Sequence, residues 1–226
     1  MPTVNVIDRT GYPFVITPLI VAGLLFAAGF TVMSGLALVL SFVLLAFFRD
    51  PHRMLPTDLS SDAVISPADG RVLFAGPGQK SVCPPGEWGQ ISIFLSPLDV
   101  HVNRVPVNGK VIDVGYQPGS FFPAYNARSA VDNERTEITV NHEGQLIVFR
   151  QIVGVLARRV VCRIRPGMTV AQGQRFGVMK FGSRMDVFIP ATAVILVEEG
   201  AKVRSGESVI AMLTSNSSKP ISNTSI

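Results

Sequence analysis

EITVNHEGQLIVFRQIV, residues 137–153, carries the clearest structural signal in this chain. Both apolar runs are rich in β-branched residues, which favour strands, and the segment Asn141-His-Glu-Gly144 between them has the residue types of a tight turn. Two such runs joined by a short turn are typical of a β-hairpin. The sequence therefore predicts two antiparallel strands here, with His142 in an exposed surface turn.

Apolar runs of the same kind continue on both sides of this hairpin, separated by turn signals such as Pro-Gly and Asn-Gly. They lie at residues 64–65, 71–74, 91–95, 110–114 and 159–164. Only residues 151–157 favour a short helix, so strands and helices do not alternate as they do in a parallel nucleotide-binding sheet. The spacing predicts a mainly β domain.

A short internal repeat points to the architecture of that domain. Gly167, Val170 and Gly173 recur with the same spacing as Gly200, Val203 and Gly206. Glycine tolerates the positive φ that many turns require, so the two copies predict two equivalent turns. We therefore expect a pseudo-symmetric β-sandwich or barrel, a hybrid with lipoyl-like features.

The N-terminal region differs from the rest, because residues 11–48 contain no Asp, Glu, Lys or Arg. One membrane-spanning helix needs about 20 residues, so this run is too long for one span and short for two. It also lacks the cleavage site of a signal peptide. We expect an apolar helical hairpin that turns within residues 29–35. The alternative is a hairpin buried inside the domain.

Basic residues flank both ends of this apolar run, at Arg9, Arg49 and Arg53. A hairpin places both ends on one side, and positive flanks favour the cytoplasmic side. The sequence thus predicts a protein of the cell membrane that faces the cytoplasm. It divides into a membrane-associating part at residues 1–53, a β-rich catalytic domain at 54–213 and a flexible tail at 214–226.

Composition narrows the function classes. The chain has 226 residues, of which 47% are hydrophobic and 16% charged, with a net charge of +4. These values argue against a disordered chain and against a nucleic-acid-binding one. Cys83 and Cys162 are too few for a disulfide framework and lack metal-ligand spacing, so we expect two separate thiols and no metal site.

Three polar clusters beside predicted strands are the candidates for chemistry. His101 lies in Ser96-Pro-Leu-Asp-Val-His101, directly after an apolar run, where polar groups are costly to bury without a role. Asp69 lies in Ser66-Pro-Ala-Asp-Gly70, which taken alone is an ordinary turn signal. The third cluster is Phe181-Gly-Ser-Arg184. His52, in the flank of the apolar run, is expected to be an interface residue.

These clusters, in this order behind an apolar segment, resemble the phosphatidylserine decarboxylase family in its short form. The resemblance covers most of the chain from Arg49 to Leu213. It also includes Asp132-Asn-Glu-Arg135, Ala157-Arg-Arg-Val-Val161 and Arg175-Phe-Gly177. No single motif is decisive, but the ordered set is highly specific.

The resemblance implies a proenzyme that cuts itself between Gly182 and Ser183. Ser183 becomes a covalent pyruvoyl group, which is the cofactor, and the products are a β chain ending at 182 and an α chain starting at 183 that stay together as a heterodimer. The pyruvoyl ketone forms an imine with the substrate amine and accepts the electrons released when CO2 leaves. The implied reaction converts phosphatidylserine to phosphatidylethanolamine at the membrane. An ether lipid with a serine headgroup fits equally well.

The family motifs also imply residue roles. His101 is the candidate acid or base, and Asp69 orients a base or acts as one. Long-form relatives carry a second histidine three positions after the first, where this sequence has Arg104. Two interpretations remain open. Either His101 and Asp69 suffice for self-cleavage, or Arg104 has another role such as binding a substrate carboxylate or phosphate, which we prefer because arginine cannot act as a general base.

A membrane-anchored carrier or adaptor of the lipoyl or biotinyl type is the main alternative. The glycine repeat is typical of such sandwiches, and Val178-Met-Lys-Phe181 resembles a Met-Lys attachment turn, with Lys180 as the modified residue. Such a fold leaves the Asp69 and His101 clusters unexplained. A purely structural membrane protein with a β domain is a third possibility.

Overall fold

A computed structural model describes residues 6–155, 160–180 and 182–214. Its helical elements are η1 (Arg9–Gly11), α1 (Tyr12–Ala27), α2 (Thr31–Phe47) and α3 (Ser129–Asp132). Its strands are β1 (Ala63–Ile65), β2 (Gly70–Pro77), β3 (Trp88–Leu95), β4 (Val102–Arg104), β5 (Gly109–Gln117), β6 (Arg135–His142), β7 (Gln145–Ile152), β8 (Val160–Cys162), β9 (Thr169–Val170), β10 (Arg175–Met179), β11 (Ser183–Pro190), β12 (Val194–Ile195), β13 (Lys202–Val203) and β14 (Val209–Met212).

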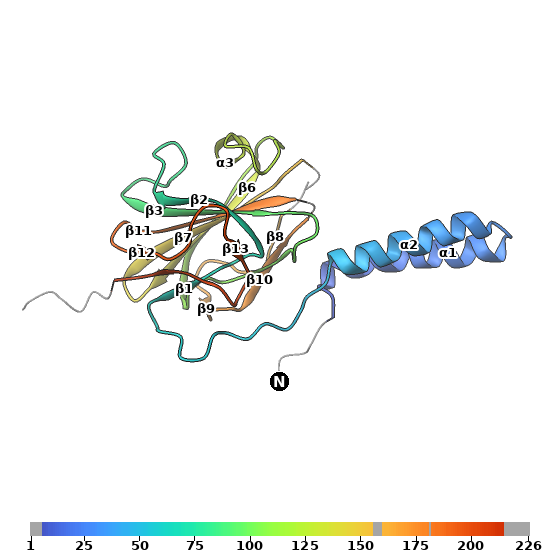
Figure 1. The fold of residues 1–226 in the computed structure, drawn as a ribbon, viewed down its shortest axis with the longest axis horizontal. Coiled ribbons are helices and arrows are strands. Elements are labelled where there is room, and N and C mark those ends of the chain that lie inside the picture. Colours follow the sequence, from blue (N-terminus) through green and yellow to red (C-terminus); the bar gives the residue numbers. More distant parts are fainter. Residues whose placement is uncertain (1–5, 156–159, 181, 215–226) are drawn as a thin grey trace, which may run out of the picture.

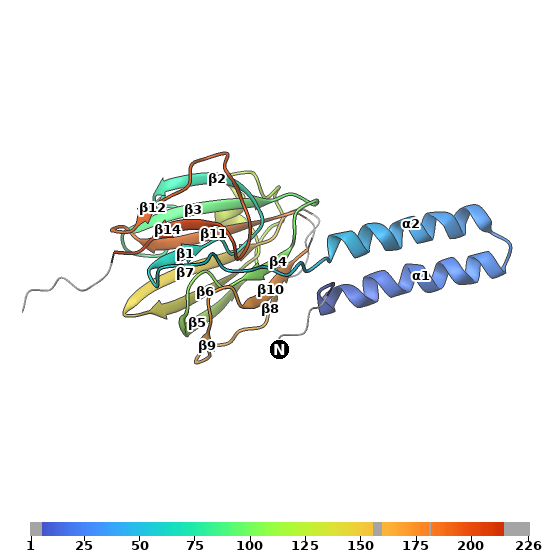
Figure 2. The ribbon, with the colours of Figure 1, turned by 60° about the horizontal axis from the view of Figure 1, so that its bottom comes forward.

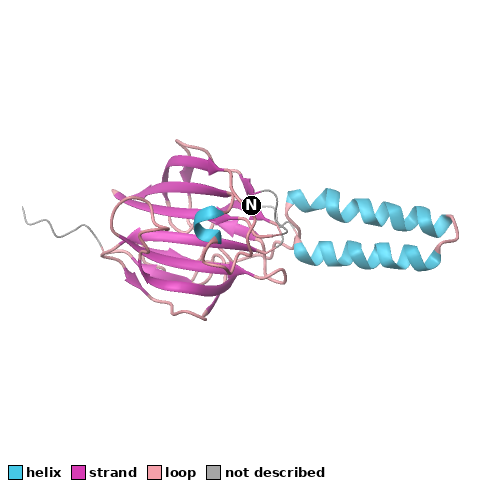
Figure 3. Ribbon diagram, turned by 90° about the horizontal axis from the view of Figure 1, so that it is seen from above, coloured by secondary structure: helices cyan, strands magenta, loops and turns pink. Residues whose placement is uncertain are grey.

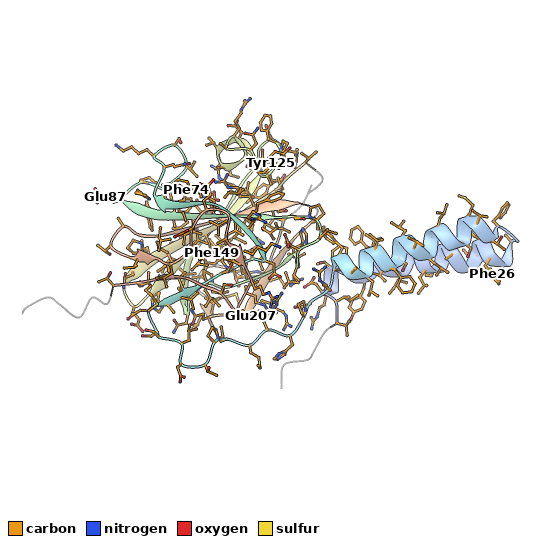
Figure 4. All side chains as sticks on the ribbon, viewed as in Figure 1. Phe26, Phe74, Glu87, Tyr125, Phe149 and Glu207 are labelled. Atoms are coloured by element: carbon orange, nitrogen blue, oxygen red, sulfur yellow. The ribbon has the colours of Figure 1, made fainter. Side chains whose placement is uncertain are left out.

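A curled antiparallel sheet forms the frame of the domain (Figure 1). Its order is β13-β2-β3-β11-β7-β6-β5-β9, and two three-stranded sheets, β1-β14-β12 and β4-β10-β8, pack with it. The core consists of fully buried apolar side chains such as Ile93, Phe149, Phe176 and Val187. Figure 4 shows Phe149 deep within the β domain. The prediction of a mainly β domain is confirmed.

The predicted repeat lies at the two edges of the eight-stranded sheet. Val203 of β13 pairs with Gly70 of β2, and Val170 of β9 pairs with Gly109 of β5. The four repeat glycines have φ between 77° and 87°, in the region that glycine tolerates best. Counted inward from its two edges, the sheet has two halves with the same arrangement of strands, β13-β2-β3-β11 and β9-β5-β6-β7. This arrangement is the pseudo-symmetry that the sequence predicts.

The apolar run forms a helical hairpin, α1 and α2, which projects from the β domain (Figures 2 and 3). The chain turns at Gly29, whose φ is +85°. Two serines of α2 tie the helices together: Ser34 Oγ donates to the Ala22 carbonyl and Ser41 Oγ donates to the Val15 carbonyl, both at 2.8 Å. These bonds satisfy hydroxyl groups that would otherwise face an apolar surrounding.

Large apolar side chains cover the outside of this hairpin. Leu24 is 67% exposed, and Phe26 and Phe42 are each 68% exposed, with Phe26 at the end far from the β domain (Figure 4). Residues 9–27 are long and apolar enough to cross a membrane, whereas α2 is shorter. The hairpin is therefore not buried inside the domain, which removes that alternative, and its surface suits a lipid surrounding.

Buried ion pairs fix both flanks of the hairpin to the β domain. Asp8 pairs with Arg163 at 2.6 Å. On the other flank, the buried Asp50 carboxylate pairs with Arg175 Nε at 2.6 Å and Arg104 Nη2 at 3.3 Å. Removing one member of a buried pair leaves an uncompensated charge, so these contacts hold the hairpin in a defined place.

Two local predictions are wrong. Residues 151 and 152 end strand β7, because both pair with β6 and β11, and the rest of the expected helix runs into residues 156–159, outside the described residues.

His142, which was predicted to be exposed, is only 1% exposed, and its Nδ1 lies 2.8 Å from the Asn108 carbonyl oxygen. The turn itself consists of Glu143 and Gly144, which have positive φ. The expected tail lies outside the described residues except for Thr214.

Candidate active site

The bond between Gly182 and Ser183 lies where β11 begins. Ser183 pairs with Leu95 of β3, and from Arg184 onward the strand also pairs with β7, which places β11 in the middle of the sheet. Gly182 has a φ of +71°, which is strained for any residue with a Cβ. The Ser183 side chain is fully buried, and within the described part of the chain its Oγ has no hydrogen-bond partner. A buried hydroxyl without a partner is costly, so this position needs an explanation.

His101 faces this bond from the loop between β3 and β4. Its Nδ1 lies 2.9 Å from the Asp99 carbonyl, which can only accept, so Nδ1 carries the proton. Nε2 is then the unprotonated nitrogen, and the Gly182 amide points at it from 3.5 Å. The structure thus brings the predicted base next to the predicted cleavage bond, although His101 and Ser183 Oγ are not hydrogen-bonded.

Burial is the main reason why the pKa of His101 is lowered to about 4; the nearby charge of Arg49 acts in the same direction, and the bond to the Asp99 carbonyl acts in the opposite one. The imidazole is consequently neutral at physiological pH, with its Nε2 lone pair directed at the Gly182 amide. An ordinary histidine pKa near 6.5 would leave part of the population protonated. The environment therefore favours the basic form.

This burial predicts a pH-dependent stability. Between pH 6.5 and pH 4 the unfolded chain binds a proton at His101 and the folded chain does not. The free energy of unfolding is therefore highest above pH 6.5, and His101 lowers it as the pH falls to about 4. The loss is on the order of 3 kcal/mol. Urea unfolding at pH 7 and pH 4.5 should show this loss in the natural protein and a smaller loss in His101→Gln. Equal losses would contradict it.

Asp69 is held elsewhere. Its Oδ2 lies 2.7 Å from Arg53 Nη2, and its Oδ1 accepts the Ser205 amide at 2.8 Å. Burial raises the pKa of this carboxyl, while the Ser205 amide and the Arg53 charge oppose the shift. The carboxylate does not hydrogen-bond His101, whose orientation comes from the Asp99 backbone. Asp69 does line a surface cavity together with Asp99.

Arg104 is also occupied by protein groups. Its guanidinium donates to the Gly173 carbonyl at 3.1 Å, to the Pro51 carbonyl at 3.2 Å and to Asp50 at 3.3 Å. The side chain is buried, and that burial lowers its pKa. These contacts hold the segment that leads out of α2. The structure does not bring Arg104 into contact with Ser183 or His101.

Two contacts of the site have no signal in the sequence. Gly154 lies so close to the cleavage bond that an added Cβ would be 2.1 Å from the Gly182 carbonyl oxygen. Phe47, at the end of α2, lies with its ring centroid 4.2 Å from that of His101. Both residues are distant in sequence from the groups they touch, so no motif could reveal them.

Gly154→Ala is expected to slow any cut at Gly182 by at least about tenfold, because the new methyl group collides with a backbone atom that cannot rotate away. Gly76→Ala is the matched control, since its Cβ would meet the Phe74 ring at an ordinary 3.6 Å. The fraction of cut chain on a denaturing gel measures the effect. Equal cutting in both variants would contradict the prediction.

Lys180, the attachment residue of the carrier alternative, is engaged with the hairpin. Its Nζ lies 4.6 Å from the ring centroid of Phe14 in α1. A lysine presented for attachment of a cofactor has to reach a modifying enzyme, and this cation–π contact points it at the apolar helices instead. The geometry therefore favours an active site at Gly182–Ser183 over a carrier lysine.

A buried serine at a strained glycine, with a neutral imidazole beside it, defines a site for nucleophilic chemistry. Comparison with known proteins places this chain among carboxy-lyases. The family model described as Phosphatidylserine decarboxylase matches residues 40–211. The chain belongs to the phosphatidylserine decarboxylase family.

Individual relatives extend over most of the chain. The phosphatidylserine decarboxylase proenzyme of Chlorobium phaeobacteroides (strain BS1) is 43% identical over 196 residues, covering 85% of this chain and 87% of that protein. That of Rickettsia felis (strain ATCC VR-1525 / URRWXCal2) is 40% identical over 216 residues, covering 92% and 90%. The resemblance derived from the sequence motifs is thereby confirmed.

Proposed function

We propose that this chain is a phosphatidylserine decarboxylase that cuts itself between Gly182 and Ser183 and works with a pyruvoyl group made from Ser183. The observation that carries the proposal is the arrangement at this bond. A fully buried serine hydroxyl follows a glycine with left-handed φ, and His101 Nε2 lies 3.5 Å from the Gly182 nitrogen, in the peptide group just before the bond.

Self-cleavage then proceeds through the chain's own atoms. Ser183 Oγ gives up its proton to a base, attacks the Gly182 carbonyl carbon and displaces the Ser183 nitrogen, which takes up a proton, so that the amide becomes an ester. His101 is the proposed base, since its Nε2 is unprotonated and lies at the Gly182 amide, next to the bond. Loss of the Ser183 α-proton expels the Gly182 carboxylate and leaves dehydroalanine. Water then converts this residue to pyruvoyl and releases ammonia.

The surroundings of Ser183 suit the group that this sequence of steps would produce. Pyruvoyl would stay at the first position of β11, where the ladder with β3 fixes the backbone and apolar neighbours keep water away. When present, it supplies an electron sink for decarboxylation of an amine substrate. His101, once protonated, is a strong acid because of its low pKa and can return a proton to the carbon that has lost CO2.

The sheet also explains how two chains would stay together after the cut. Strand β11 lies between β3 and β7, and β14 pairs with β1, so the α chain would remain hydrogen-bonded to the β chain on both sides. The proposed partner in the complex is therefore the other fragment of the same precursor. Residues 54–213 would form the catalytic domain of that heterodimer.

The hairpin supports a membrane location. A phospholipid leaves the bilayer only at a cost of about 0.8 kcal/mol for each CH2 exposed to water, so the site has to lie near the lipid surface. The exposed apolar helices would hold it there. Arg49 at the base would favour an anionic leaflet and the cytoplasmic face, whereas Arg53 is paired with Asp69 and Glu207.

The contacts of the two remaining predicted residues favour supporting roles. The Asp69 carboxylate holds Arg53 and the Ser205 amide, and Asp69 lines a cavity together with Asp99 of the His101 loop. We therefore propose that Asp69 orients neighbouring groups of the site. Arg104 could bind a substrate anion only by giving up its bonds to Asp50 and Gly173. We therefore favour a structural role for Arg104 in holding the linker after α2.

The test is to purify the full-length chain in detergent, supply vesicles of phosphatidylserine, and measure phosphatidylethanolamine and CO2 together with the intact masses of the protein. We expect turnover and two chains that meet at Gly182 and Ser183, the smaller one with a ketone that borohydride reduces. Vesicles of phosphatidylcholine are the negative control. A protein that decarboxylates at full rate as one 24.3 kDa chain would overturn the proposal.

A further inference from the structure

The end of α2 lies directly against the candidate base. The Phe47 ring and the His101 imidazole are 4.2 Å apart between centroids, and both side chains are buried, at 6% and 1% exposed. Two residues later, Arg49 Nη2 donates to the Leu98 carbonyl at 2.6 Å, in the loop that carries His101. The hairpin therefore contacts the imidazole and also the backbone that supports it.

We infer that the end of α2 is a positioning element of the active site, in which Phe47 orients His101 and shields it from water, so that self-cleavage depends on a docked hairpin. This inference rests on the proposed function. The hairpin is then more than an attachment to lipid, because it completes one wall of the site. Phe47 acts through His101 and is not itself a catalytic residue.

The imidazole is fixed from three directions. The Asp99 carbonyl holds Nδ1, the Gly182 amide faces Nε2, and the Phe47 ring lies against the ring at an interplanar angle of 35°. Without Phe47 the first two contacts would remain, but water could reach the imidazole. Desolvation is what keeps such a group neutral, so its loss should make the base easier to protonate.

Burial is the larger cause of the neutral imidazole, and the charge of Arg49 is a smaller one. Arg49 is the cation at the end of α2. Asp99, in the same loop, directs its carboxylate at the Ser96 amide, at 2.8 Å. Lys180, from the segment before Gly182, lies over the Phe14 ring. Phe47 is one of the groups that bury the imidazole, and Phe14 of α1 contacts the segment that leads into the cleavage bond.

The experiment follows chain splitting over time after cell-free synthesis of the full-length protein with phosphatidylserine and phosphatidylcholine vesicles, from pH 5.5 to pH 8. Phe47→Ala is compared with the natural chain and with Phe42→Ala, a control on α2 whose side chain is 68% exposed. If the His101 pKa returns to about 6.5, Phe47→Ala should cut about tenfold more slowly at pH 5.5 than at pH 8. The natural chain and the control should change less than about twofold. Phe47→Tyr should restore the natural profile.

A second measurement keeps the inference testable if Phe47→Ala does not fold. Phe47→Leu retains an apolar contact, and the chain has only three histidines, so labelled-imidazole NMR can follow His101 in uncut Ser183→Ala protein. A His101 titration midpoint that rises in neither Phe47→Ala nor Phe47→Leu, or a Phe47→Ala cutting profile that overlaps the natural one, would overturn the inference. A natural chain that never splits would overturn the proposed function instead, and the NMR titration would still decide the role of Phe47.

Discussion

Ser183→Ala is expected to remain a single chain of 24.3 kDa, whereas the natural protein is expected to separate into residues 1–182 and 183–226. The substitution removes the only atom that can attack the Gly182 carbonyl from this position and hardly changes the volume at a fully buried site. It also removes a buried hydroxyl that lacks a partner among the described residues, so the folded state should be at least as stable as before. Loss of cutting would then reflect chemistry and not misfolding.

Denaturing electrophoresis and intact mass measure this outcome, and a urea unfolding curve confirms the fold. Ser208→Ala is the matched control, because Ser208 lies in the same expected α chain and its hydroxyl only accepts the Arg204 amide at 2.9 Å in the described structure. The control should split like the natural protein. A Ser183→Ala chain that still separates after Gly182 would exclude Ser183 as the nucleophile.

Local sequence signals predicted those features that depend on neighbours in the chain. The turn after residue 142, the repeated glycines and the helical hairpin all depend on backbone preferences of a few consecutive residues, and all are present. The positions of Gly182 and His101 followed from motifs, and the sheet brings them together because Ser183 pairs with Leu95 just before the His101 loop.

Features set by distant contacts could not be predicted in this way. His142 was expected at the surface because turns are usually exposed, but the Asn108 carbonyl from before β5 buries its imidazole. The motif around Asp69 predicts that it orients a base or acts as one, but it could not predict that Arg53 and the Ser205 amide contact its carboxylate. The Phe47 contact joins an apolar helix to a polar loop, and neither segment contains a sign of the other.

His101→Gln should slow self-cleavage by about 10²- to 10⁴-fold, the range that a positioned general base contributes. Glutamine can keep a hydrogen bond near the Asp99 carbonyl and stays packed under Phe47, but it has no lone pair that takes up a proton near neutral pH. Because the His101 pKa is lowered to about 4, the natural cutting rate should be flat from pH 8 to pH 5.5 and fall only below that.

The time course of splitting, measured across that pH range, distinguishes loss of the base itself from a change in the surroundings of the base. His52→Gln is the control histidine, since it lines the cavity beside Arg104 and should leave the rate unchanged. Added imidazole should partly restore cutting in His101→Gly, where the missing ring leaves space under Phe47, and should not do so in Ser183→Ala. If His101→Gln cut at the natural rate, the base would have to be another group, and Asp69, whose pKa is raised by burial, would be the next residue to replace.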